Sequence, residues 1–98
     1  MRRGTTPVIN IETDIDLSDA TNLFVSFEQG KEIVVEKTLS DVTITEDAVS
    51  IHLTQEDTLK FTDDKVVRVQ LRCTLGGEKL ASNIMTAEVG EILKGGEI

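Results

Sequence analysis

Aromatic side chains are scarce in this sequence of 98 residues, which has three Phe and no Trp or Tyr. Proteins that bind bases or sugars generally stack them on aromatic rings, and three rings offer little material for such a platform. The hydrophobic core is therefore expected to be aliphatic, built mainly from Val, Ile and Leu.

Cysteine and histidine are each present once. The single cysteine, Cys73, cannot close a disulfide within the chain, so folding in a cytoplasm suffices. Its place in the strand pattern puts Cys73 among core residues, where a thiol behaves as a small hydrophobe. His52 has no second histidine to join it in a catalytic or metal-binding group, and the pattern around it predicts an exposed strand residue.

Long apolar runs are absent. A secretory signal needs roughly 7–15 consecutive apolar residues after its positive charges, whereas polar side chains interrupt the segment that follows Arg2 and Arg3. No stretch approaches the roughly 20 apolar residues of a membrane span. The sequence predicts neither a signal peptide nor a transmembrane helix. We expect one domain over residues 7–93, between a flexible arm at 1–6 and a flexible tail at 94–98.

Basic residues are outnumbered, with 10 Lys and Arg against 18 Asp and Glu, which gives a formal net charge of −8. Phosphate binding requires clustered positive charge, so this balance disfavours nucleic acid and, for the same reason, anionic membranes. An acidic surface also keeps a protein soluble in a crowded assembly.

Motifs that carry chemistry are missing as well. The acidic run from Glu12 to Asp19 does not fit an EF-hand, because its sixth and twelfth positions, counted from Asp14, hold Asp19 and Val25 instead of Gly and Glu. No glycine-rich segment precedes a helix to cradle phosphate. We therefore assign no catalytic, cofactor-binding or metal-binding residue and expect no enzyme activity. A weak cation site in the acidic run stays open.

Strict alternation of apolar and polar residues is what the sequence does contain, and it is the pattern of half-buried β-strands. It is cleanest in residues 66–73, where Val67, Val69, Leu71 and Cys73 would share the buried face. Further strands are expected at residues 9–13, 23–28, 33–37, 42–44, 49–53 and 79–89, the last with a bulge at Ser82-Asn83.

Turn signals separate these strands at short intervals. Gly30 and the pair Gly76-Gly77 mark tight hairpins, because glycine tolerates positive φ. Residues 54–57 resemble a capping box and predict one helical turn, and residues 16–20 predict another. Seven short antiparallel strands with one or two helical turns indicate an all-β, immunoglobulin-like sandwich.

The outward faces of the strands carry candidates for contact. Arg68 and Arg72 alternate on the sixth strand, and Glu32 and Glu36 alternate on the third. In an immunoglobulin-like order these strands are neighbours, so we expect ion pairs between them that fix the register or present a polar face to a partner. Phe24 points outward by the same alternation and is a candidate for covering by a loop or a neighbouring subunit.

Several segments spread along nearly the whole chain carry a resemblance to known proteins. They are MRRGTTP (1–7), DLSDA (16–20), FEQG (27–30), LTQEDTL (53–59), VQLR (69–72) and ASNI (81–84). Together they make the chain similar to small, mostly uncharacterised proteins encoded in phages and prophages of Gram-positive gut bacteria. It also resembles, more loosely, the amino-terminal sandwich of phage baseplate upper proteins.

The resemblance implies a virion or tail-region accessory protein with an immunoglobulin-like fold, made in the bacterial cytoplasm and without catalytic residues or a cofactor. The expected partners are other phage structural proteins or copies of the chain itself, as a homo-oligomer. A basic arm on an acidic body fits such a role, with Arg2 and Arg3 docking on an acidic patch of a neighbouring copy.

Two other functions stay open. One is a cytoplasmic phage protein that binds a host protein through its acidic surface and so imitates nucleic acid. The other is a carbohydrate-binding sandwich at the particle surface, for which Phe24 would supply the exposed ring.

Overall fold

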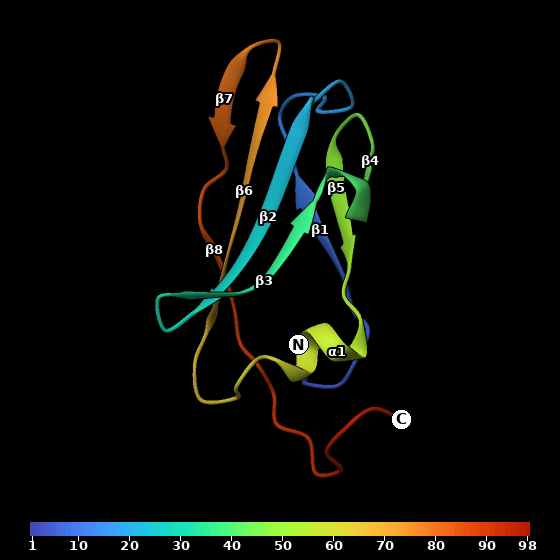
Figure 1. Cartoon of the computed structure of the whole chain (residues 1–98), viewed down its shortest axis with the longest axis vertical. Helices are drawn as coiled ribbons and strands as arrows, with labels where there is room; N and C mark the ends of the chain where they lie inside the picture. Colours follow the sequence, from blue (N-terminus) through green and yellow to red (C-terminus); the bar gives the residue numbers. More distant parts are fainter.

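The alternating segments form β-strands in the computed structural model, which describes residues 1–98 (Figure 1). Two antiparallel sheets enclose one hydrophobic core, so the chain is an all-β sandwich. The strands are β1 (Val8–Glu12), β2 (Asn22–Gln29), β3 (Glu32–Thr38), β4 (Val42–Ile44), β5 (Ala48–His52), β6 (Val67–Leu75), β7 (Glu78–Ala81) and β8 (Met85–Ala87).

The larger sheet has the order β3-β2-β6-β7, and β8 pairs with the other end of β6. Its centre is the pair β2 and β6, whose register sets Leu23 opposite Cys73 and Phe27 opposite Val69. Because both strands alternate in the same phase, their apolar side chains fall on one face and are buried there. The predicted inward residues of both strands are confirmed.

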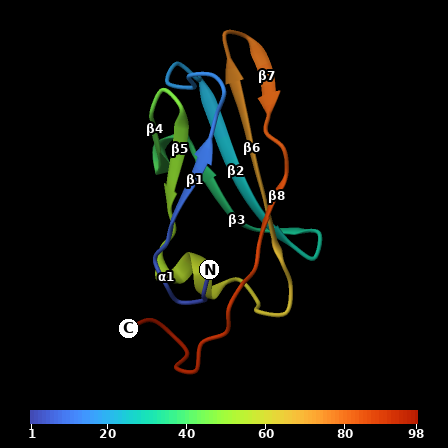
Figure 2. The ribbon, with the colours of Figure 1, turned by 180° about the vertical axis from the view of Figure 1, so that it is seen from behind.

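The smaller sheet has the order β1-β5-β4 and lies across the core from the larger one (Figure 2). β1 and β5 pair antiparallel, with Ile11 opposite Val49 and Ile9 opposite Ile51. Ile11, Val49 and Ile51 are buried against the larger sheet. The two sheets therefore bury their apolar faces against each other and leave polar faces outside.

The core contains 16 buried residues from both sheets and their connections. Phe27 of β2 and Phe61 are fully buried, and their rings pack in a tilted arrangement with centroids 6.1 Å apart. The other members, apart from the cysteine Cys73, are aliphatic, as the composition predicts: Ile11, Leu17, Ala20, Leu23, Val25, Val35, Val49, Ile51, Leu53, Val67, Val69, Leu71 and Val89.

The strand order departs from the immunoglobulin arrangement at one point. β2 lies between β3 and β6, so the third and sixth strands are not neighbours. The reason is the two-residue turn of Gly30 (φ 58°) and Lys31 (φ 70°), which has the positive φ values of a type I′ hairpin. Such a turn leaves no chain for crossing to the opposite sheet, and β3 must pair beside β2. The prediction of ion pairs between the third and sixth strands is therefore wrong.

The last predicted strand is interrupted where a bulge was expected. Residues 82–84 separate β7 from β8, which gives eight strands in place of seven. Ser82 bridges the gap: its backbone N–H donates to the Leu71 carbonyl at 2.8 Å, and its Oγ accepts from the Leu71 N–H at 3.0 Å. The hydroxyl thus takes over a ladder hydrogen bond that the strand backbone no longer makes.

One of the two predicted helical turns is confirmed. In α1 (Gln55–Leu59), the Thr54 hydroxyl accepts from the Asp57 N–H, and the Asp57 carboxylate accepts from the Thr54 N–H. Residues 16–20 are not helical, because the Asp16 carboxylate accepts from the Ser18 N–H and hydroxyl and so competes with helical bonding. The second short helix is η1 (Leu39–Asp41). Neither helix is long and apolar enough to cross a membrane.

Both ends of the chain contact the domain. Residues 1–3 lie along residues 88–91, held by hydrogen bonds of 2.6 to 3.2 Å. At the other end, the Gln55 side chain makes two hydrogen bonds with the backbone of Ile98. The arm at 1–6 is therefore not a free extension in this structure, while the mobility of both ends in solution stays a prediction.

Candidate interaction surface

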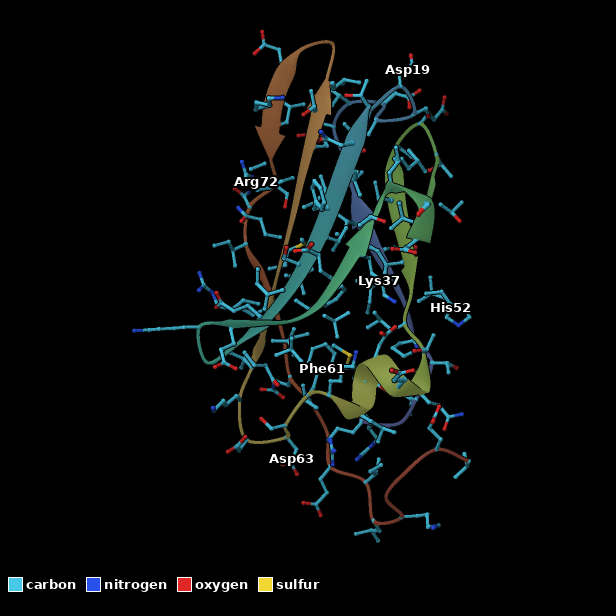
Figure 3. The ribbon with its side chains drawn as sticks, in the orientation of Figure 1. Asp19, Lys37, His52, Phe61, Asp63 and Arg72 are labelled. Atoms are coloured by element: carbon cyan, nitrogen blue, oxygen red, sulfur yellow. The ribbon has the colours of Figure 1, made fainter.

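Three of the five residues predicted to make contacts converge on one surface. Phe24, Arg68 and Arg72 line a shallow hollow of about 340 Å³ on the outer face of the larger sheet. Figure 3 shows Arg72 on the side of the molecule away from the smaller sheet. We call this surface the outer hollow; it also includes Ser26, Glu28, Ile33, Glu36, Gln70 and Ile84.

The register of β2 and β6 builds the centre of the outer hollow. Phe24 lies opposite Arg72, Ser26 opposite Gln70, and Glu28 opposite Arg68. These residues alternate with buried ones along both strands, so their side chains must stand on the outer face. The outward direction of each of these side chains thus follows from the same alternation that directs their neighbours into the core.

Three large apolar side chains remain exposed in the outer hollow. The exposed fractions are 41% for Phe24, 59% for Ile33 and 48% for Ile84. Single exposed apolar residues are common on protein surfaces, but a group of them around one depression marks a contact surface. Three of the eight large apolar side chains that the fold leaves exposed therefore lie in the outer hollow.

Charges of both signs line the same hollow in equal number. Glu28 and Glu36 are acidic, and Arg68 and Arg72 are basic. Arg68 donates to the Glu28 carboxylate at 2.8 Å, and this pair is partly exposed. Arg72 has no ion-pair partner in the chain, so its guanidinium group is available to another molecule.

Arg2 and Arg3 lie elsewhere and bind the chain's own backbone. Arg2 donates to the carbonyl of Glu91 at 2.8 Å, and Arg3 donates to the carbonyl of Leu59 at 3.0 Å. Leu59 is the last residue of α1, where a positive charge is favoured by the helix dipole. The structure therefore does not bring these arginines to the outer hollow, and it gives them intramolecular roles.

The remaining titratable candidates stay apart from one another. His52 is exposed on the side of the smaller sheet, as predicted (Figure 3). Cys73 is buried, and desolvation raises the pKa of its thiol, which disfavours the reactive thiolate. Hydrogen bonds from the Ser18 side chain and backbone lower the pKa of Asp16. No group of three or more His, Cys, Asp or Glu side chains comes together to hold a metal ion.

Sequence reasoning missed both isoleucines of the outer hollow. Ile33 follows the hairpin turn, and its outward direction depends on the register shift between Phe27 and Glu28 in the pairing of β2 with β3. Ile84 is exposed because the chain leaves the ladder at residues 82–84. One signal was available: in the predicted strand 79–89, Ile84 is an apolar residue in the outward phase, beside the inward Met85.

No protein-family model matches the chain, and no match was found among curated proteins or solved structures. The resemblance to phage proteins is thus neither supported nor contradicted by these comparisons. What the protein does has to be argued from its own surface.

Proposed function

We propose that the chain is a non-enzymatic interaction module that takes part in assembling a phage particle. The outer hollow is the observation that carries the proposal of a binding role. It joins three exposed apolar side chains with an unpaired arginine on a rigid sheet, and such a surface suits contact with another protein. A rigid platform holds its contact residues in place before the partner arrives, which lowers the entropy lost on binding.

The phage context rests on the sequence resemblance described above. On that basis the partners are other phage structural proteins or further copies of the chain, and the protein is made in the bacterial cytoplasm and ends in the virion. Its net charge of −8 suits a subunit that must stay soluble at high concentration before assembly.

Carbohydrate binding has less support from the surface. Phe27 and Phe61 are fully buried, so Phe24 is the single exposed aromatic ring. Sugar-binding surfaces usually combine several rings with polar groups, and one ring beside two arginines suits a protein contact better. Binding of a host protein through acidic surface would use regions other than the outer hollow, whose charges balance.

Mass spectrometry of purified particles, induced from the lysogen that carries this gene, tests the proposal. We expect the chain at a stoichiometry comparable to that of known structural proteins. Its absence from particles, combined with clear expression in the infected cell, would reject a virion role and favour binding of a host protein.

A further inference from the structure

We propose that the outer hollow is a contact between two copies of this chain, packed face to face about a two-fold axis that runs parallel to β2 and β6. The inference rests on the proposed assembly function and names its partner. A two-fold contact requires a surface that complements itself, because the same residues meet in both directions. The outer hollow has this property through its strand register.

The register determines which residues face each other. Rotation by half a turn about an axis between β2 and β6 lays β2 of one copy over β6 of the other and keeps each residue at its level along the strands. Each side chain then faces a second copy of its own cross-strand neighbour. Glu28 meets Arg68, Ser26 meets Gln70, and Phe24 meets Arg72.

Each of these facing pairs is chemically favourable. A carboxylate accepts charge-assisted hydrogen bonds from a guanidinium group, and a hydroxyl pairs with a side-chain amide. The Arg72 guanidinium group can stack on the Phe24 ring as a cation–π contact, and it has no ion pair to give up. Sheets that pack face to face with aligned strands keep such rows together at crossing angles of about 30°.

The apolar flanks fit the same axis. Ile33 belongs to β3 on one side of the central pair, and Ile84 follows β7 on the other side. The half-turn exchanges the two sides, so Ile33 of each copy comes near Ile84 of the other. Both side chains are about half exposed in the single chain, and this contact would cover them.

Charge also favours this surface over the rest of the molecule. The chain carries a net charge of −8, so two copies repel each other on average. The outer hollow holds two acidic and two basic side chains and is neutral overall. When two copies approach through this face, opposite charges attract each other in specific pairs, and the neutral face adds no net repulsion.

Charge-reversal variants distinguish ion pairs formed between two copies from the ion pair formed within one copy. Arg68→Glu leaves two acids at this level of the hollow, and Glu28→Arg leaves two bases, so neither variant can pair with itself. We expect each variant alone to associate at least about tenfold more weakly than the wild type in sedimentation equilibrium. An equimolar mixture should regain association, because the acidic face meets the basic one.

Lys94→Glu and Glu46→Arg are matched controls, since they change the net charge by the same amounts at exposed positions outside the lining of the hollow. Glu46 lies in the turn between β4 and β5 of the smaller sheet, and Lys94 lies in the C-terminal segment. Both should associate like the wild type. The double variant Glu28→Arg/Arg68→Glu restores every facing pair and should also recover association. Thermal melts of all variants check that the fold is retained.

A wild-type chain that stays monomeric from micromolar to millimolar concentration would overturn the proposed contact. So would folded single variants that associate like the wild type, or a mixture that gains nothing over its components. These results are independent of particle composition: a monomeric chain found in virions rejects this contact alone, and a dimer absent from virions rejects the particle role alone.

Discussion

Gln29 is a buried amide at the end of β2 and holds the loop that leads into β6. Its Nε2 donates to the carbonyls of Thr62 and Lys65 at 2.8 and 2.9 Å, and its Oε1 accepts from the Thr62 N–H at 2.9 Å. One side chain thus satisfies three backbone groups of a segment that has no regular secondary structure. Because Gln29 is itself buried, its amide group needs these hydrogen-bond partners.

Gln29→Leu is therefore expected to lower the free energy of unfolding by about 1–3 kcal/mol, because it removes three partly buried hydrogen bonds that tie residues 62–65 to β2. Urea unfolding monitored by far-UV circular dichroism measures this loss. Gln55→Leu is the matched control. The Nε2 and Oε1 atoms of Gln55 also both make hydrogen bonds with the backbone, but their partner is the exposed residue Ile98. Equal losses in the two variants would contradict the argument from burial.

Lys37 and Asp57 form the more buried of the two ion pairs, with Nζ and Oδ2 2.7 Å apart. The pair links β3 of the larger sheet to α1. Burial alone would raise the pKa of the Asp57 carboxyl, but hydrogen bonds from Lys37 and Thr54 outweigh it and hold the pKa below its usual value. The folded state therefore favours the ionised carboxylate.

The stability that this carboxylate contributes must depend on pH. A lowered folded pKa means that the contribution is complete above the unfolded value of about 3.9 and is lost as the pH falls through the folded pKa. We expect wild type and Asp57→Asn to differ by about 1–3 kcal/mol at pH 7 and to converge below about pH 4. Urea unfolding at pH 7 and pH 3 measures both differences. An undiminished gap at pH 3 would assign the loss to packing instead of charge.

At the scale of elements, the β2–β3 hairpin contains a residue in an unfavourable conformation. Lys31 is the one residue other than glycine with positive φ, at 70°. A Cβ atom in this region costs about 1 kcal/mol, and the type I′ turn imposes it on both central residues. The Gly76-Gly77 turn between β6 and β7 also has positive φ at both central residues, but it avoids that cost because glycine has no Cβ atom.

Lys31→Gly should accordingly raise the free energy of unfolding by about 0.5–1 kcal/mol, since strain relief exceeds the entropy gained by the unfolded chain. Thermal and urea unfolding provide the measurement. Lys31→Ala is the control, because it also removes the charge but keeps a Cβ atom in the strained position. If both variants change stability equally, the effect belongs to the lysine side chain and not to the backbone.

The strands could be predicted because alternation depends on neighbouring residues only, and the apolar faces of β2, β5 and β6 lie where the pattern puts them. Strand order depends on connections, and here two sequence-based expectations conflicted. A tight turn at Gly30 requires β3 to lie beside β2, whereas the immunoglobulin order would separate them. The local signal was the correct one, because a two-residue turn admits no other pairing.

The candidate surface was predictable in part for the same reason. The outward directions of Phe24, Arg68 and Arg72 follow from alternation, but their meeting in one hollow follows from the β2–β6 register. The pairing of Arg68 with Glu28 instead of Glu36 also needs that register. Lys37 and Asp57 meet only because the sandwich places α1 against β3, and no local pattern in the sequence encodes that contact.

At the scale of the whole molecule, the small dimensions of the chain let its excess negative charges repel one another. The chain extends 46 × 26 × 17 Å and carries 18 acidic against 10 basic side chains. At an ionic strength of about 10 mM the Debye length is about 30 Å, which exceeds both shorter dimensions. Charges on opposite faces of the sandwich therefore repel one another through and around the protein at low salt.

Raising NaCl from about 10 mM to about 150 mM shortens the Debye length to about 8 Å and should stabilise the fold at pH 7 by about 0.5–1 kcal/mol. The two ion pairs lose some strength in the same step, but they are few and one is largely buried. Urea midpoints at both salt concentrations measure the change. Repeating the experiment near pH 4.5, the isoelectric point, supplies the control, since the net charge and its salt effect should vanish there. Destabilisation by salt at pH 7 would mean that specific pairs, not overall repulsion, dominate the electrostatics of this fold.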